Sequence, residues 1–173
     1  SNGDGTFHII STGELVTDWH RGLLTLDTPR SQGATGFLRA AGRIELGDVA
    51  FESHNPFGAL LAIALDDRPL AQSQKILFQV GAIDRPTGFS TTPVKLAWNH
   101  GEYTGHRIVA TGRLPWQVER IRCAVTLKQA AGRVVSATPL DADLRPQPPI
   151  IGADAGADYV LPLPAESLYV VVA

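Results

Sequence analysis

The chain contains two apolar segments, ALLAIAL at residues 59–65 and KILFQVGAI at residues 75–83, with a short polar stretch between them. The polar stretch begins with the turn sequence Asp66-Asp67-Arg68-Pro69, and residues 70–74 after it are expected to form one helical turn. Residues 59–65 are too few for a core helix, and their continuous apolar character predicts a strand that is buried on both faces. We therefore expect the two segments to pair as central strands of a sheet.

The rest of the chain has the same organisation of short apolar segments between turns. Residues 14–19 and 23–27 are predicted to form a hairpin around Gly22, and residues 43–46 and 49–52 a second one around Gly47-Asp48. Further strands are expected at residues 94–98, 107–111, 118–126, 134–137, 159–161 and 168–172. The pattern predicts an all-β fold, an antiparallel two-sheet β-sandwich of jelly-roll-like type with about ten to twelve strands.

The length of 173 residues is that of one domain. We expect residues 1–10 to be a linker or tag remnant and residues 11–173 to be a single β-sandwich domain. The chain contains no Met, even at its first position, which indicates a piece taken from a longer protein. It has no apolar run of membrane-spanning length, so no membrane contact is expected.

The charge pattern and the motif content exclude several classes of function. The net charge is −2, and no cluster of Lys and Arg offers a surface for phosphates, so nucleic acid is not an expected partner. The lone Cys123 cannot form an internal disulfide. The Gly-x-Ser-x-Gly, P-loop, dinucleotide-binding and His-Glu-x-x-His motifs are all absent from the sequence.

Two weak metal-binding patterns are present. His100, Glu102 and His106 are residue types that zinc accepts, but their spacing matches no known zinc motif, and the interpretation as solvated turn residues is favoured. Residues 2–5 (NGDG) and the pair Asp154 and Asp158 resemble parts of a calcium loop without its bidentate Glu. We expect no cofactor, with a structural calcium as the alternative.

Aromatic residues next to polar ones are the strongest candidates for a binding site. Sugars stack their apolar faces on aromatic rings, and amide, carboxylate and Arg groups bind their hydroxyls. Residues 98–103 (WNHGEY) are expected to form one loop with two aromatic rings. The predicted ligand-binding residues are Trp98, Asn99, Glu102, Tyr103, Arg107, Arg113 and Trp116. For each Trp, packing in the core or against another domain is the alternative.

Several motifs support a family resemblance. They are residues 12–15 (TGEL), 22–32 (GLLTLDTPRSQ), 55–58 (NPFG), 65–70 (LDDRPL), 73–81 (SQKILFQVG) and 85–89 (RPTGF). With them, the chain resembles the C-terminal β-sandwich domain that follows the catalytic barrel in a group of large secreted bacterial glycoside hydrolases. The resemblance is strongest over roughly residues 10–90 and carries over no catalytic residue.

This resemblance implies a non-catalytic, carbohydrate-binding-module-like accessory domain in an extracellular or periplasmic bacterial enzyme. Its expected partners are a polysaccharide or oligosaccharide and the catalytic domain of the parent chain. A purely structural domain that packs on the catalytic barrel is the first alternative. An autonomous glycan-active enzyme is the second, and it would require a cleft with two converging carboxylates or a His/Glu metal site near Glu102 and His106.

Overall fold

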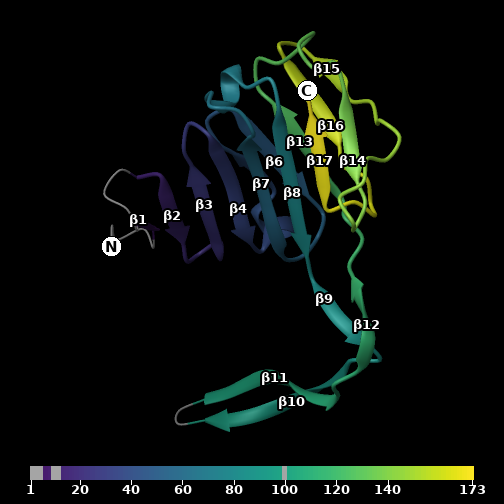
Figure 1. Ribbon diagram of the computed structural model, residues 1–173. Coiled ribbons are helices and arrows are strands. Elements are labelled where there is room, and N and C mark those ends of the chain that lie inside the picture. The colour runs from purple at the N-terminus through teal and green to yellow at the C-terminus, as the bar shows by residue number, and fades with distance from the viewer. Residues whose placement is uncertain (1–5, 9–12, 99–100) are drawn as a thin grey trace. The chain divides into compact units, whose positions relative to one another are not determined.

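The computed structural model describes residues 6–8, 13–98 and 101–173 of the chain (Figure 1). These residues form two compact units, each of which is described by itself. The first unit, called the sandwich, comprises the described residues up to Ala82 together with Arg120–Ala173, and the second, called the ribbon unit, comprises Ile83–Glu119. The ribbon unit is therefore inserted in the sequence of the sandwich.

The larger sheet of the sandwich is antiparallel at every described pairing. In spatial order its strands are β1 (Thr6–His8), β2 (Leu15–Asp18), β3 (Leu23–Asp27), β4 (Ser31–Gly36), β7 (Gly58–Ala64), β8 (Ile76–Ala82), β17 (Tyr169–Val172) and β14 (Ala137–Leu140). The first predicted hairpin is confirmed as β2–β3. The predicted central pair is confirmed as β7–β8, in which Leu60 lies opposite Val80 (Figure 1).

The smaller sheet of the sandwich is also antiparallel. In spatial order its strands are β15 (Ala153–Ala155), β16 (Asp158–Pro162), β13 (Cys123–Leu127), β6 (Val49–Ser53) and β5 (Arg43–Glu45). The hairpin predicted around Gly47-Asp48 is confirmed as β5–β6. The described helices are short: α1 (Leu38–Ala41) and a 3₁₀ turn, η1 (Leu70–Gln72), where one helical turn is expected.

Both sheets contribute to one hydrophobic core. Phe51 and Val125 of the smaller sheet and Leu60 and Phe78 of the larger sheet are each at most 2% exposed. Because alternate side chains of a strand point to opposite faces, each sheet can bury one face against the other. The two-sheet sandwich predicted from the sequence is confirmed.

Strand β7 corrects the expectation that residues 59–65 are buried on both faces. Leu60, Ala62 and Ala64 are buried, whereas Leu61 and Ile63 are only half-buried and Leu65 lies past the end of the strand, 48% exposed. In this sandwich the inner face of the larger sheet meets the smaller sheet, and its outer face retains solvent contact. Even within this continuous apolar run, successive residues therefore alternate between the buried inner face and the partly exposed outer face of the sheet.

The strands are more numerous than the ten to twelve expected, and several of their predicted bounds are wrong. The strand expected at residues 118–126 is divided between β12 (Arg113–Val118) and β13. In the segment between β12 and β13, the Asn55 side chain donates to the Arg120 carbonyl and accepts from the Arg122 amide, both at 2.8 Å. These two backbone groups therefore bond to a side chain and not to a neighbouring strand. The strand expected from residue 134 begins at Ala137 instead, after a turn in which the Arg133 amide donates to the Ala130 carbonyl.

Candidate binding face of the ribbon unit

All the residues predicted to bind a ligand lie in the sequence of the ribbon unit. Its strands are β9 (Asp84–Thr87), β10 (Ser90–Trp98), β11 (Gly101–Ala110) and β12. Strands β10 and β11 form an antiparallel hairpin. Strand β9, which precedes this hairpin in the sequence, pairs with β12, which follows it. Every residue of β11 and β12 is exposed except the half-buried Gly105. A two-stranded ribbon has no second layer to cover its side chains, so their exposure follows from the architecture.

The register of β10 and β11 sorts their side chains onto two faces. Residues directly opposite each other in an antiparallel ladder point to the same face, and successive pairs alternate between faces. One face, called the apolar face, includes the pairs Leu96 opposite Tyr103, Val94 opposite Gly105, and Thr92 opposite Arg107, and Gly101 belongs to the same face.

The other face, called the polar face, carries four pairs: Ala97 opposite Glu102, Lys95 opposite Thr104, Pro93 opposite His106, and Thr91 opposite Ile108. On this face the Lys95 Nζ lies 3.7 Å from Glu102 Oε2, and the Thr91 hydroxyl lies 3.4 Å from His106 Nδ1. The Lys95–Glu102 ion pair and His106 therefore lie on the polar face, whereas Val94, Leu96 and Tyr103 lie on the apolar face.

Two glycines flatten the apolar face around Tyr103. Gly101 and Gly105 stand two residues before and after Tyr103 on the same strand face. A Cβ at Gly105 would lie 3.3 Å from Leu96 Cδ1, and one at Gly101 would lie 3.7 Å from atoms of the Tyr103 ring. The side chains of Leu96 and Tyr103 thus rest over bare backbone. Tyr103 is 58% exposed and Leu96 is 54% exposed. The apolar face around these two side chains is therefore flat and accessible to solvent.

The β9–β12 ladder presents a second set of exposed apolar side chains. Trp116 lies opposite Pro86 and is 55% exposed, and Val118 lies opposite Asp84. The Thr87 hydroxyl donates to the Pro115 carbonyl at 2.7 Å, and the Arg85 guanidinium lies 5.4 Å from the centre of the Phe89 ring.

The structure brings together only part of the predicted site. Tyr103 and Arg107 share the apolar face, whereas Glu102 lies on the polar face, paired with Lys95. The expectation that residues 98–103 form a single loop is corrected because residues 101–103 belong to β11. Trp98 ends β10 opposite Gly101, and Asn99 lies outside the described residues. Arg113 and Trp116 belong to the other ladder.

The predicted site omitted Val94 and Leu96, which complete the apolar face. The signal that identifies them is the alternation of residues 92–96 (TPVKL), in which Val94 and Leu96 stand two apart, together with the same alternation at Tyr103, Gly105 and Arg107. Once the two segments are recognised as partners in a hairpin, their alternation with a period of two residues places all five residues on the same face.

The side chains of the two weak metal-binding patterns bond to nearby protein groups in the described part of the chain. Glu102 and His106 share the polar face, and each contacts a neighbour on β10, while His100 is outside the described residues. Asp154 accepts from the Gly132 amide and Asp158 from the Gln129 amide, so both carboxylates hold turns. Within the described ranges, no three His, Cys, Asp or Glu side chains gather as a metal site. Residues 2–5 fall outside those ranges.

Comparison with known proteins adds no further constraint on this surface. No protein-family model, no curated protein and no solved structure matches the chain. None of the described helices is long and apolar enough to cross a membrane.

Proposed function

We propose that the chain is a non-catalytic accessory domain that binds polysaccharide through the apolar face of the ribbon unit. In this proposal the parent protein is an extracellular or periplasmic bacterial glycoside hydrolase, as the motif resemblance implies. The observation that carries the proposal is the position of Tyr103, which is exposed, lies opposite Leu96 and is flanked on its strand face by Gly101 and Gly105.

The chemistry of sugar binding fits this arrangement. A pyranose ring presents a flat apolar face, and an exposed aromatic ring with glycines on either side of it along the strand can accept that face. Arg107 lies four residues along the same strand face, about 13 Å from Tyr103 at the usual rise of 3.3 Å per residue. Its guanidinium donors and the hydroxyl of Thr92 opposite it would then bond to hydroxyls of a different unit of the same sugar chain.

The placement of Glu102 supports a binding role without catalysis. Glycoside hydrolysis by the common mechanisms needs two carboxyl groups on either side of the scissile bond, roughly 5 to 10 Å apart. Glu102 is the carboxylate next to Tyr103 in the sequence, but it lies on the polar face and is paired with Lys95. A sugar on the apolar face would therefore not contact it.

Affinity electrophoresis against a panel of polysaccharides tests this function. We expect the wild-type chain to be retarded by at least one polysaccharide, and Tyr103→Ala to lose about 1–3 kcal/mol of binding free energy, as for loss of one well-placed aromatic contact. Glu102→Gln, on the opposite face, is the matched control and should keep the wild-type affinity. Equal retardation of Tyr103→Ala and wild type would refute the assignment of the apolar face.

A second candidate is a structural contact with the catalytic domain of the parent chain. It is favoured by the aliphatic character of other exposed residues of the ribbon unit, since aliphatic side chains offer no flat face to a sugar. These residues are Ile108, Val109, Leu114 and Val118, which are 48 to 75% exposed. The test is thermal unfolding of the parent enzyme with Leu114→Ser and Val118→Ser: a lower unfolding temperature of the catalytic domain, with unchanged polysaccharide retardation, would favour this candidate.

A further inference from the structure

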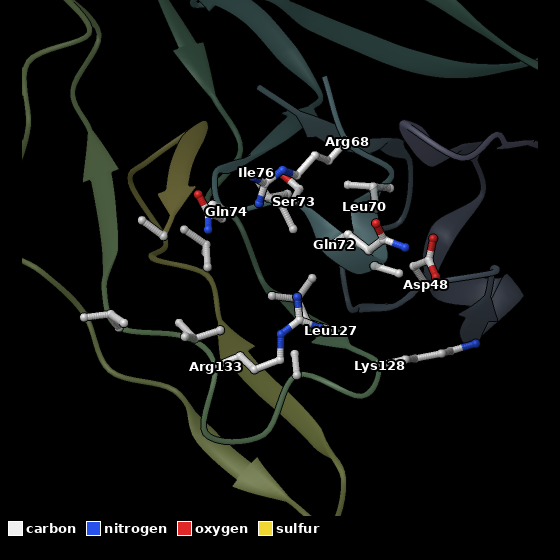
Figure 2. A pocket seen from close by; sticks show the side chains of 16 residues that line it. Asp48, Arg68, Leu70, Gln72, Ser73, Gln74, Ile76, Leu127, Lys128 and Arg133 are labelled. Atoms are coloured by element: carbon white, nitrogen blue, oxygen red, sulfur yellow. The ribbon is translucent and has the colours of Figure 1, made fainter. Parts of the chain in front are cut away.

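The sandwich contains a cleft that the proposed polysaccharide site does not use. It has a volume of about 450 Å³ and is formed by the segment around η1, the segment that follows β13, and the end of β17 (Figure 2). This volume lies in the range of about 300–1,000 Å³ that is usual for small-molecule sites. All its described lining residues belong to the sandwich.

The inner wall of the cleft is aliphatic. Leu70, Ile76, Leu127 and Val172 line it, and each is at most 5% exposed. None of the described residues that line the cleft is aromatic. The cleft therefore lacks the stacking surface that a sugar ring prefers, and it suits an aliphatic group instead.

Two arginines provide positive charge at the cleft. Figure 2 shows Arg68 and Arg133 on opposite sides of it, with the Arg133 side chain extending inwards. The only hydrogen bond of the Arg133 guanidinium within the described residues is a long one of 3.4 Å from Nη1 to the Gln129 carbonyl. The Arg68 guanidinium makes no hydrogen bond with any residue that the structure describes, but its charge helps to lower the pKa of the nearby Asp66 carboxylate. Both retain donors for a ligand.

The other charged groups near the cleft are already engaged. Lys128 extends away from it in Figure 2 and pairs with Glu45 at 2.9 Å. Asp48 accepts a hydrogen bond of 3.1 Å from the Gln32 side chain. The Asp66 carboxylate, in the turn before η1, accepts from the backbone amides of Arg68 and Gln74. Hydrogen bonds from neutral groups leave the charges of Asp48 and Asp66 in place, so what the two guanidinium groups offer a ligand is free hydrogen-bond donors.

We propose that this cleft binds a small aliphatic carboxylate, with its hydrocarbon body on the wall of Leu70, Ile76, Leu127 and Val172 and its carboxylate between Arg68 and Arg133. Guanidinium groups bind carboxylates through parallel charge-assisted hydrogen bonds, and such bonds are about twice as strong as neutral ones. Burial of the hydrocarbon body supplies the remaining affinity, because each methylene removed from water adds a favourable contribution.

The test is titration of the ¹⁵N-labelled chain with octanoate, followed by amide chemical shifts. We expect saturable shifts confined to residues that line the cleft, with the ribbon unit as an internal reference. Octanol, which lacks the charge, and acetate, which lacks the hydrocarbon body, should each bind at least about tenfold more weakly. No saturable shift at the cleft, or equal binding of octanol and octanoate, would overturn the proposal.

Substitution of the arginines separates the charge from the shape of the cleft. Arg68→Gln and Arg133→Gln should each weaken octanoate binding about tenfold, the effect expected for loss of one charged hydrogen-bonding partner. Arg39→Gln, on the exposed side of α1, is the matched control and should bind as the wild type does. The same spectra report whether each variant is folded. Unchanged affinity in both cleft variants would refute the carboxylate site, whatever the outcome for polysaccharide binding.

Discussion

The side chain of Gln32 on β4 holds the backbone at Asp48, where β6 of the opposite sheet begins. Gln32 Oε1 accepts from the amides of Asp48 at 2.8 Å and Val49 at 3.1 Å, and its Nε2 donates to the Asp48 carboxylate. Gln32 is only 2% exposed. A buried amide with several partners fixes the position of one sheet relative to the other, because loss of the amide leaves buried groups without partners.

Gln32→Leu should therefore destabilise the sandwich. The substitution leaves the Asp48 and Val49 amides unbonded, and a buried unsatisfied group costs about 1–3 kcal/mol, so we expect a loss of about 2–6 kcal/mol. Chemical denaturation measures it. Gln79→Leu, at an exposed position of β8, is the matched control and should change stability by about 0.5 kcal/mol or less. Equal effects of the two substitutions would contradict the bridging role of Gln32.

Removal of the Phe51 ring should open a cavity in the core. Phe51 is 1% exposed and lies on β6 opposite Val125 of β13. Phe51→Ala is expected to cost about 3–5 kcal/mol, as for other buried Phe residues. Phe37→Ala is the comparison, since Phe37 is 56% exposed and contacts only the edge of the Phe57 ring among described aromatic residues. Its cost should be about 0.5–1.5 kcal/mol.

The Cys123 thiol should be unreactive in the folded protein. Burial raises the pKa of Cys123 to about 12, so almost no thiolate is present near neutral pH. We expect a thiol reagent such as 5,5′-dithiobis(2-nitrobenzoate) to label the chain only at the rate of unfolding, and to label it at once in denaturant. Rapid labelling under native conditions would show that β13 opens without global unfolding.

The free energy of unfolding at acid pH should depend in part on Glu45. Hydrogen bonds from Lys128 and then Arg43 lower the pKa of Glu45 from its ordinary value of 4.5. A lowered folded-state pKa gives stability that is present above pH 4.5 and is lost as the pH falls through the lower value. Because Glu45 is 53% exposed, we expect about 0.2–1 kcal/mol. Glu45→Gln should reduce the dependence of the free energy of unfolding on pH below pH 4.5, which denaturation at a series of pH values measures. An unchanged pH dependence in this variant would contradict the prediction.

The sequence predicts the sandwich well because local signals and tertiary packing agree there. Tight turns at Gly22 and Gly47-Asp48 determine which strands pair, and alternation then determines the inner face. The same rule explains why residues 59–65 mislead: a run without polar residues hides its alternation, and only the position of the second sheet shows which side is covered.

The candidate site is predicted less well than the sandwich. Residues 94–98 and 107–111 are recognised as strands, but the polar residues between them indicate a loop, so Glu102 and Tyr103 are expected to act together. In the structure, consecutive residues of β11 point to opposite faces, which separates these two side chains. The division of the chain into two units depends on contacts between distant segments, and no local pattern in the sequence indicates it.

Gly105 keeps the surface beside Tyr103 flat, because it has no side chain. A Cβ at this position would lie 3.3 Å from Leu96 Cδ1, so Gly105→Val should lift the Leu96 side chain and place a branched group beside the Tyr103 ring. Val also favours strands more than Gly, so the fold of β11 should not suffer. We expect polysaccharide affinity to fall about tenfold, the loss of about 1.4 kcal/mol that an obstructed stacking face would produce. Affinity electrophoresis measures it, with Thr104→Val on the polar face as the matched control. If Gly105→Val binds as tightly as Thr104→Val, the flat surface around Tyr103 is not where the polysaccharide binds.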